Sequence, residues 1–273
     1  MSRLYLRQVV LTVTPSSGQS KVLRDLRIRF KAVKNEESKP NTMEIEVFNL
    51  SEKSRSLLEG KNTSLVLEAG YDGSTSVIFK GNITRVNHEL EEADIISKIE
   101  AADGGSRYRK ARIEKGIPPG AKTKQVIDEL VKSLGLTQGP ILGVPNTQYA
   151  NGISLSGLAK DRLDDVCRKN RLQWSIQDGV VQIIPEAETT QDSAVLVSPD
   201  SGLIGSPTRT KTGVEFKMLL QPNLRPGRKV KLESRFIKGE FKVSRVDHSG
   251  DSHEGDFLSE CEAIAYGKGK AKK

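Results

Sequence analysis

The densest group of side chains that could do chemistry lies in the segment DHSGDSHEGD, near the C-terminus. Its possible metal ligands are Asp247, His248, Asp251, His253 and Asp256. Histidine and carboxylate side chains are common zinc ligands, but their spacing here matches no compact motif such as His-Glu-x-x-His. Gly and Ser residues instead give the segment the composition of a turn between two strands. We therefore predict no metal site and expect His248 to be a structural residue.

The other reactive residue types lack the partners that catalysis needs. The sequence contains neither a Gly-x-Ser-x-Gly nucleophile elbow nor a Walker phosphate-binding loop. Cys167 lies in a helical pattern and Cys261 in an alternating one, so we expect two small buried hydrophobes and no disulfide. The acidic pair Glu91-Glu92 falls in an expected turn. We predict that the protein is not an enzyme and has no catalytic, cofactor-binding or metal-binding residues.

The chain of 273 residues has 43 Lys and Arg against 35 Asp and Glu, a net charge of +8. This balance permits contact with nucleic acid or a membrane without requiring it, and aromatic residues for base stacking make up only 5%. Part of the excess lies in GKGKAKK, residues 267–273, which we expect to be a solvated, disordered tail. Arg7 interrupts the apolar residues near the N-terminus, and no apolar run approaches membrane-spanning length. We expect no secretory signal and no membrane anchor.

Alternating hydrophobicity predicts β-strands over the first hundred residues. Two of them carry opposite charges on their polar faces, since Leu26–Lys31 is basic and Met43–Phe48 is acidic. If they pair, the two charged rows face each other, so we expect the basic row to be structural and not phosphate-binding. A short helix is predicted at Ser54–Leu58 with Ser51 as its N-cap. Further strands are predicted at Leu65–Ala69, Val77–Val86 and Ile95–Ala101.

Residues 104–188 show a mixed pattern that predicts a small α+β module. One helical face ends at Gly135 and carries Val126, Ile127, Leu130, Val131 and Leu134. A second apolar stripe predicts another helix with Leu155, Leu158, Ala159, Leu163, Val166 and Cys167. A hairpin turning at Asp178-Gly179 closes the module, and we expect Trp174 to pack on the helices.

Strands return after residue 188, at Ala194–Val197, Val214–Leu220, Arg228–Glu233, Glu240–Val246 and Phe257–Ala265. The last hairpin repeats an earlier one, because RVDH at Arg245–His248 matches RVNH at Arg85–His88, and DFLSECEA matches DIISKIEA. The triplet IKG at Ile237–Gly239 also matches FKG at Phe79–Gly81. Chance similarity between alternating strands is the alternative. Because the matches keep their order, we predict two copies of one β unit, and we expect His88 and His248 to be structural in both.

The predicted fold is therefore mainly β with an α+β insertion. It comprises two related β-barrel or sandwich domains, separated by a small module of two helices and a hairpin. The predicted boundaries are 1–103 for the first β domain, 104–188 for the module, 189–266 for the second β domain and 267–273 for the tail.

Several segments, taken in their order, resemble a known family. They are NTMEIEVFNLSEKSRSLLEG, LEAGYDG, IFKGNITRV, WSIQDGVVQIIP, VSPDSGLIGSP and PNLRPGRKVKLES. Together they look like a phage-tail baseplate hub protein of contractile-tailed, Mu-like phages and prophages. The resemblance runs from about Leu4 to about Tyr266, and its order carries more weight than any single motif. The chain is shorter than many hubs and has no appended lysozyme or spike domain.

The resemblance implies a structural role. Hubs of this family form homotrimers in which each protomer supplies two tube-like β domains, so three chains make a pseudo-sixfold ring. Such a ring adapts a sixfold tail tube or distal tail protein to a trimeric spike protein. Its lumen passes DNA or tape-measure protein, and a lumen rich in Lys and Arg would argue against this. The implied location is the virion tail baseplate, after synthesis in the host cytoplasm.

Two other functions stay open at the level of sequence. The first is a peptidoglycan- or carbohydrate-binding tail module centred on residues 104–188, since small α+β units of this kind also bind cell-wall glycans. The second is nucleic-acid binding through the net charge of +8.

Overall fold

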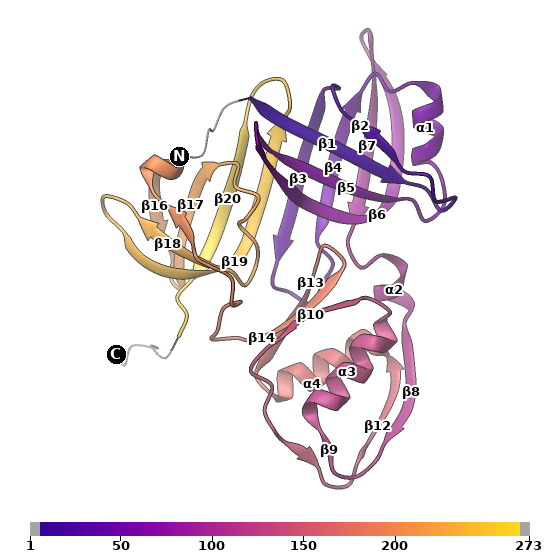
Figure 1. Ribbon diagram of the computed structural model, residues 1–273, viewed down its shortest axis with the longest axis vertical. Helices are drawn as coiled ribbons and strands as arrows, with labels where there is room; N and C mark the ends of the chain where they lie inside the picture. The colour runs from indigo at the N-terminus through magenta and orange to yellow at the C-terminus, as the bar shows by residue number, and fades with distance from the viewer. Residues whose placement is uncertain (1–5, 268–273) are drawn as a thin grey trace.

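Strands from the N-terminal and C-terminal parts of the chain join in one 13-stranded sheet (Figure 1). The N-terminal strands are β1 (Arg7–Thr14), β2 (Lys21–Leu23), β3 (Ile28–Asn35), β4 (Thr42–Phe48), β5 (Ser64–Tyr71), β6 (Ser74–Glu91) and β7 (Asp94–Ala102). The C-terminal strands are β15 (Val195–Val197), β16 (Leu203–Arg209), β17 (Gly213–Leu219), β18 (Lys229–Glu233), β19 (Lys238–Asp251) and β20 (Phe257–Ile264). The mainly β character is confirmed, although the sequence patterns did not single out β1, β2 or β16.

This computed structural model describes residues 6–267. The basic tail predicted at 267–273 lies outside the described residues except for Gly267. We call the strands β1–β7 the N-terminal unit and the strands β15–β20 the C-terminal unit. Two short helices accompany them, α1 (Glu52–Leu58) and the 3₁₀ helix η1 (Pro199–Ser201). The N-cap of α1 is Ser51, as predicted, and its side chain accepts the Ser54 N–H.

The two units share one strand order. In the N-terminal unit it is β3-β4-β7-β6-β5, and in the C-terminal unit it is β16-β17-β20-β19-β18. The units meet edge to edge, because the distal half of β19 pairs antiparallel with β3 and sets His248 opposite Ala32. The two regions therefore form one hydrogen-bonded surface, which the sequence did not predict.

The repeated hairpin has the same register in both units. Arg85 lies opposite Glu100 on β6 and β7, and Arg245 lies opposite Glu262 on β19 and β20. Both pairs follow a β-bulge, which inserts one extra residue into the longer strand. The bulged residue of each unit also donates a side-chain hydrogen bond to the neighbouring strand. Thr84 Oγ1 donates to Glu100 O at 3.1 Å, and Ser244 Oγ donates to Glu262 O at 3.0 Å. The match between the two hairpins is confirmed.

The predicted match of the triplets FKG and IKG is wrong. Phe79 lies opposite Leu67 on β5, and the residue in the same position of the C-terminal unit is Gly239, opposite Leu232 on β18. The triplets are therefore two residues out of register. A side-chain period of two hides such a slip in the sequence, because a shift of two residues keeps the same face outward.

Each region encloses its own hydrophobic cluster. In the N-terminal unit, the sheet folds back along the long strand β6, so that β1 and β5 cover β3, β4 and β7 (Figure 1). The cluster between these layers includes Leu11, Ile45 and Leu67. The cluster of the C-terminal unit includes Phe216 and Val243.

A third cluster belongs to the segment between the units, which we call the α+β unit. Its elements are α2 (Gly105–Lys110), β8 (Arg112–Ile117), β9 (Ala121–Lys122), α3 (Thr123–Leu134), β10 (Thr137–Ile141), β11 (Gln148–Tyr149), β12 (Ile153–Leu158), α4 (Ala159–Lys169), β13 (Leu172–Gln177) and β14 (Val180–Pro185). The cluster packs α3 and α4 against β13 and β14, with Trp174 buried among them as predicted. Gly135 ends α3 with φ +64°, a left-handed cap that favours glycine.

One boundary in this unit differs from the prediction. Leu155 and Leu158 lie on strand β12, because β12 pairs with β8 along its whole length and α4 begins only at Ala159. The three apolar residues Leu155, Leu158 and Ala159 fall within five positions and fit both a strand end and a helix start, so periodicity alone misplaced the boundary. The unit also contains more strands than the predicted hairpin. Within residues 6–267, every helix is too short or too polar to span a membrane.

A candidate assembly surface

One side of the large sheet faces away from the hydrophobic clusters and carries charged side chains. On β4, for example, Glu44 and Glu46 alternate with buried Met43 and Ile45. Residues directly opposite each other in an antiparallel pair lie on the same face, so strand pairing extends this pattern sideways. The first row is present once in each unit. It consists of Lys31, Glu44, Glu100 and Arg85 in the N-terminal unit and of the corresponding residues Thr208, Glu215, Glu262 and Arg245 in the C-terminal unit.

A second row runs beside the first. It consists of Arg29, Glu46, Lys98 and Asn87 in the N-terminal unit and of Ile204, Lys217, Glu260 and Asp247 in the C-terminal unit. We call the sixteen residues of these two rows the open face. Six of them are basic and seven are acidic, so the open face has a net charge of −1 although the whole chain has +8.

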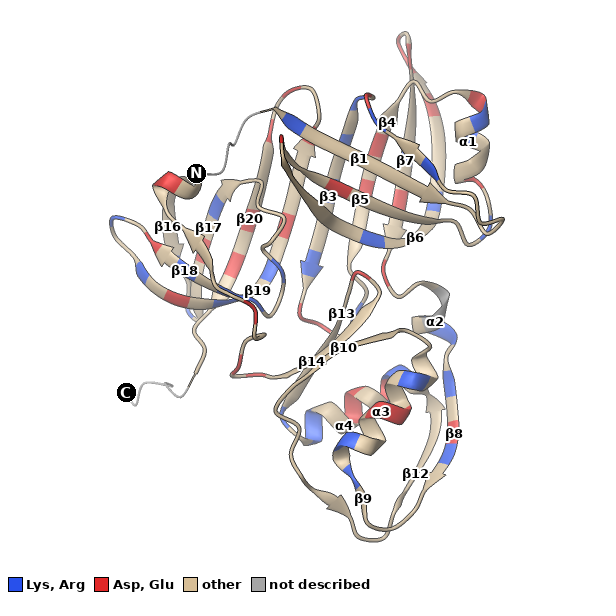
Figure 2. Ribbon diagram, viewed as in Figure 1, with Lys and Arg blue, Asp and Glu red and all other residues tan. Residues whose placement is uncertain are grey.

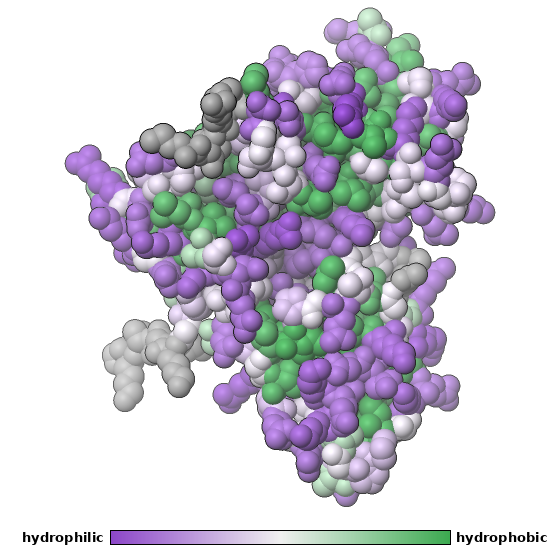
Figure 3. All heavy atoms as spheres, viewed as in Figure 1, coloured by the Kyte–Doolittle hydropathy of each residue, from purple (hydrophilic) through white to green (hydrophobic). Residues whose placement is uncertain are grey.

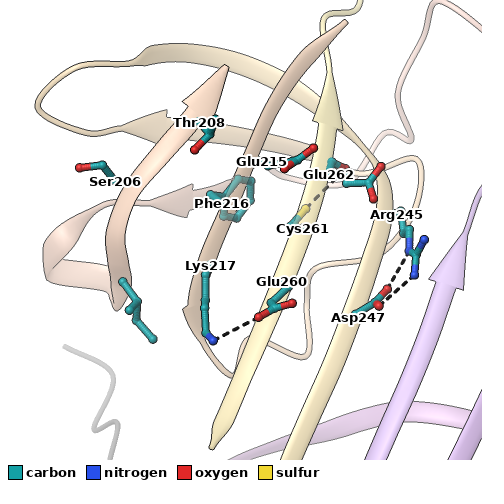
Figure 4. A pocket seen from close by; sticks show the side chains of 11 residues that line it. Ser206, Thr208, Glu215, Phe216, Lys217, Arg245, Asp247, Glu260, Cys261 and Glu262 are labelled. Carbon is teal, nitrogen blue, oxygen red and sulfur yellow. Dashed lines mark hydrogen bonds and ion pairs between the residues drawn. The ribbon is translucent and has the colours of Figure 1, made fainter. Parts of the chain in front are cut away.

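Ion pairs engage many of the basic side chains on the open face. In the C-terminal unit, Lys217 pairs with Glu260 at 3.1 Å and Arg245 with Asp247 at 2.9 Å (Figure 4). In the N-terminal unit, Arg29 pairs with Glu46 at 3.5 Å and Arg85 with Glu100 at 3.7 Å. Such exposed pairs add little stability, at most about 1 kcal/mol each. Because of these pairs, the open face carries no uninterrupted stripe of positive charge. This supports the prediction that the basic residues of Leu26–Lys31 are structural and do not bind phosphate.

The open face is shallowly hollowed at matching places in the two units. A depression of about 370 Å³ lies over β17, β20 and β19, where the close-up shows the side chains of Glu215, Glu262 and Arg245 (Figure 4). A second one, of about 260 Å³, lies over the corresponding strands β4, β7 and β6. The repeated unit therefore presents a shallow depression over corresponding strands twice on one side of the chain.

The turn between β19 and β20 binds the C-terminal unit to the N-terminal unit. The Asp251 carboxylate accepts hydrogen bonds from Arg27 Nη2 at 2.8 Å and from Arg29 Nε at 2.9 Å. Burial raises the pKa of Asp251, but these bonds and the backbone N–H of His253 outweigh it and hold the pKa at about 2. Arg7 donates to three carbonyl groups of the same turn and lies 5.2 Å from the centre of the Phe257 ring.

The two repeated histidines hold the same hydrogen bond. His248 Nδ1 lies 2.8 Å from Ser259 Oγ, and His88 Nδ1 lies 2.9 Å from Ser97 Oγ. His248 Nε2 donates to the carbonyl of Leu224 at 3.2 Å, which ties the loop before β18 to the sheet. Complete burial lowers the pKa of His248 to about 3, so the ring is neutral at physiological pH.

The acidic and histidine side chains of DHSGDSHEGD point to different partners. Asp247 pairs with Arg245, Asp251 with the arginines of the N-terminal unit, and His253 Nδ1 with Ser252 Oγ. Within residues 6–267, no three His, Cys, Asp or Glu side chains gather as a metal site would require. Cys167 and Cys261 are buried free thiols whose pKa burial raises, Cys167 to about 12, as expected of inert hydrophobic cysteines.

The α+β unit meets the large sheet through buried polar groups. Lys34 Nζ donates to Asp178 Oδ2 at 2.7 Å, and the same carboxylate accepts the Lys80 backbone N–H at 3.1 Å. Asp103 accepts the backbone and side-chain N–H groups of Asn41 at 2.9 and 3.0 Å. On the face shown in Figure 3, a hydrophilic band separates the apolar areas of the sheet from those of the α+β unit. We call this region the polar junction.

These features describe a chain built from a repeated β unit, and the comparisons with known proteins specify its class. The family model "Baseplate hub gp41" matches residues 6–263, so the chain belongs to the baseplate hub gp41 family of phage tail proteins. A search of curated proteins found no match to the sequence.

Solved structures with a similar fold include tail proteins and a component of a type VI secretion system. The 43 kDa tail protein of prophage MuSo2 from Shewanella oneidensis has a TM-score of 0.65 at 9% identity, covering 95% of this chain and 98% of that one. A tail protein of Neisseria meningitidis MC58 has a TM-score of 0.64 at 10% identity, with 96% and 97% covered. The E. coli c3393 protein, a type VI secretion component similar to the T4 tail proteins gp27 and gp5, has a TM-score of 0.59 at 11% identity, with 94% and 77% covered. At these identities the likeness concerns the fold.

Proposed function

We propose that this baseplate hub protein forms a homotrimeric ring at the tail tip. In this ring, each chain supplies its N-terminal and C-terminal units as two tube-like β domains, so that three chains present six similar units. The ring adapts a sixfold tail tube or distal tail protein to a trimeric spike protein. It belongs to the virion baseplate and serves as a structural component, not as an enzyme.

The observation that carries this proposal is the pairing of β3 with β19. It joins two units of the same strand order side by side within one chain. A heterologous contact of this kind, repeated with a fixed rotation, generates a ring when the rotation closes. Six units that meet at the same angle need only three chains, which reconciles sixfold and threefold symmetry.

The open face is the surface that we assign to the lumen. On the other side of the sheet, β1 and β5 cover the N-terminal cluster, and β15 and β18 contribute residues to the C-terminal cluster. A two-layered wall closes into a ring more easily when the open face lies inside and the covering strands lie outside, because the outer layer has the larger circumference. The near-neutral open face suits the passage of DNA or tape-measure protein, since free lysines and arginines would bind the phosphate backbone.

The test is a reconstruction of the tail tip that contains this chain. We expect density for three copies around the tail axis, with the open face turned inward and six β units in one ring. A tail tip without threefold density for this chain would refute the proposed function. A ring with the open face turned outward would refute the lumen assignment and leave the trimer standing.

A further inference from the structure

A hollow of about 770 Å³ lies between the N-terminal unit and the α+β unit, and it is larger than either depression on the open face. Residues 80–84 of β6 line it together with the α1–β5 loop, the start of α2 and the turn between β13 and β14 (Figure 1). No residue of the open face lines it. Its lining includes Lys80 and Arg109 but no aspartate or glutamate, and we call it the basic cleft.

Left-handed backbone turns shape three sides of the basic cleft. Asn62 has φ +56°, Gly105 has φ +51° and Gly179 has φ +82°. At Gly105 both the conformation and the space call for glycine, because an added Cβ would lie 2.5 Å from Asn82 Oδ1 on β6. The start of α2 therefore approaches β6 closely. The cleft is thus formed in the free chain, since turns and strands hold its walls.

Four polar side chains of the basic cleft have no partner within the described part of the chain. The Lys80 ammonium and the Arg109 guanidinium form no hydrogen bond and no ion pair there, and the same holds for the side-chain amides of Asn62 and Asn82. On the open face, by contrast, basic side chains such as Arg85 pair with carboxylates. The cleft therefore combines two uncompensated positive charges with two amides that are free to bind.

The segment that follows the cleft along the chain adds to its positive charge. Residues 108–117 contain four basic residues and one acidic residue, a net charge of +3, and Figure 2 shows basic positions along β8. Among these four, only Lys115 forms an ion pair within the described residues, with Glu129 at 2.7 Å. Part of the chain's excess of +8 is thus concentrated beside the cleft, while the open face carries −1.

We propose that the basic cleft binds an acidic, extended peptide segment of a partner protein. Lys80 and Arg109 pair with carboxylates of that segment, in charge-assisted hydrogen bonds. Asn62 and Asn82 each offer a donor and an acceptor, which is what the N–H and C=O groups of a peptide backbone need. The volume of the cleft lies in the range of preformed ligand sites.

Nucleic acid matches the basic cleft less well than a peptide does. Proteins that hold single strands stack the bases on aromatic side chains, and the lining contains none. Duplex DNA is bound by basic surfaces that follow its phosphate backbone, whereas this site is a recess with two cations. The inference goes beyond the proposed ring and does not depend on it, because the cleft lies within one chain and off the open face.

Peptide binding to the full chain tests the assignment. The probe is a fluorescein-labelled peptide of alternating Glu and Ser, and its neutral counterpart has Gln in place of Glu. We expect fluorescence anisotropy to show saturable binding of the acidic peptide only. The double variant Lys80→Glu with Arg109→Glu should raise the dissociation constant at least about tenfold, because repulsion replaces two attractive contacts. Both positions are exposed, so the variant keeps its core intact.

The matched control carries the same change of charge away from the cleft. It is Arg235→Glu with Lys238→Glu, at exposed positions of the β18–β19 hairpin, and it should leave the dissociation constant unchanged. Equal effects of the two double variants would show attraction to the net charge of the chain and overturn the proposal. The absence of any binding of the acidic peptide to the unmodified chain would overturn it as well.

A photoreactive form of the acidic peptide shows where it binds. We expect crosslinks, mapped by mass spectrometry, within residues 62–64, 80–84 and 104–109. Crosslinks confined to other segments would overturn the proposal. Competition with single-stranded DNA is the last arm of the test, because DNA that displaces the peptide at a lower concentration than unlabelled acidic peptide would make the cleft a nucleic-acid site instead.

Discussion

A single buried imidazole shows how the C-terminal unit is held together. His248 links β20 to the loop before β18, since its ring accepts from Ser259 and donates to Leu224. The same position in the N-terminal unit is His88, which keeps the hydrogen bond to serine and lies 3.5 Å from Glu59 at the end of α1. The repeated histidine therefore contacts the segment that covers the sheet in each unit. This segment is the short helix α1 in the N-terminal unit and the loop before β18 in the C-terminal unit.

Replacing His248 with alanine should destabilise the chain. The change opens a cavity and leaves the Leu224 carbonyl without its donor, and we expect the free energy of unfolding to fall by about 3 kcal/mol. Chemical denaturation followed by circular dichroism measures the change. The matched control His253→Ala removes an exposed ring and should cost less than about 0.5 kcal/mol. Equal effects of the two substitutions would contradict the structural role of His248.

At the scale of elements, the turn between β13 and β14 decides how the α+β unit sits on the sheet. Asp178 has φ +57° and Gly179 has φ +82°, the left-handed pair that a two-residue hairpin turn requires. The turn also presents the Asp178 carboxylate to Lys34, whose side chain is only 1% exposed. Burial lowers the pKa of Lys34, and the carboxylate opposes that effect.

The substitution Asp178→Asn tests this contact while keeping a residue that tolerates the turn conformation. It leaves a buried ammonium group without its counter-charge, so we expect a loss of about 3 kcal/mol in the free energy of unfolding. The double variant with Lys34→Met should recover part of that loss, which a double-mutant cycle measures. Purely additive effects would show that the two side chains do not interact. Asp165→Asn, in an exposed ion pair, serves as the control.

Two buried carboxyl groups also predict a dependence on pH. One is Asp103 of the polar junction, and the other is Glu36, which pairs with the buried Lys242 at 2.8 Å. Burial raises the pKa of Asp103 and that of Glu36 to about 7 each, above their values in the unfolded chain. The stabilisation linked to these protons is fully present below the unfolded pKa and is lost as the pH rises through 7. We expect the free energy of unfolding to fall by on the order of 2 kcal/mol per group between pH 5 and pH 7.

Denaturation at a series of pH values measures this slope, and Asp103→Asn should reduce it. His248 acts in the opposite sense, because its lowered pKa removes stability as the pH falls below about 6.5. The His248→Ala variant isolates the contribution of the carboxyl groups. A slope that Asp103→Asn leaves unchanged would show that Asp103 is ionised throughout this range.

At the scale of the whole molecule, the distribution of charge affects DNA binding more than the net charge does. The chain carries +8, but the open face carries −1 and spreads its basic side chains among acidic ones. Figure 2 shows acidic residues along β20 as well as basic ones along the neighbouring strands. Because phosphate contacts dominate DNA affinity, this arrangement predicts that the open face of the proposed ring would retain DNA weakly at physiological salt.

Reversing acidic charges on the open face should create a DNA-binding surface. We expect a variant with four Glu→Lys substitutions to bind duplex DNA with an affinity that falls steeply with salt, measured by fluorescence anisotropy. The four positions are Glu44, Glu100, Glu215 and Glu262. A control with the same charge change elsewhere uses Glu52, Glu114, Asp161 and Glu188, which are exposed and lie off the open face. Equal salt slopes for the two variants would show that the open face has no special access to DNA.

Much of this architecture follows from local patterns. The period of two along Met43–Phe48 fixed its buried and charged faces, and the burial of Met43, Ile45 and Val47 agrees with it. The repeat of RVNH as RVDH located the hairpin and its histidines. Local patterns were less reliable where a strand runs straight into a helix, as at Leu155–Leu158, and where a slip of two residues preserves the face, as at Phe79–Gly81.

The sequence by itself determined most strands of the two β units, the repeated hairpin and the family resemblance, because these depend on short-range periodicity and on the order of segments. Only the tertiary structure decided that β3 pairs with β19, that Lys34 is buried against Asp178, and that the open face is nearly neutral. The first two of these join residues more than a hundred positions apart, and the third depends on which face every strand turns outward. Such pairings depend on which edges and faces remain exposed once every unit has formed its core, and no local pattern contains that information.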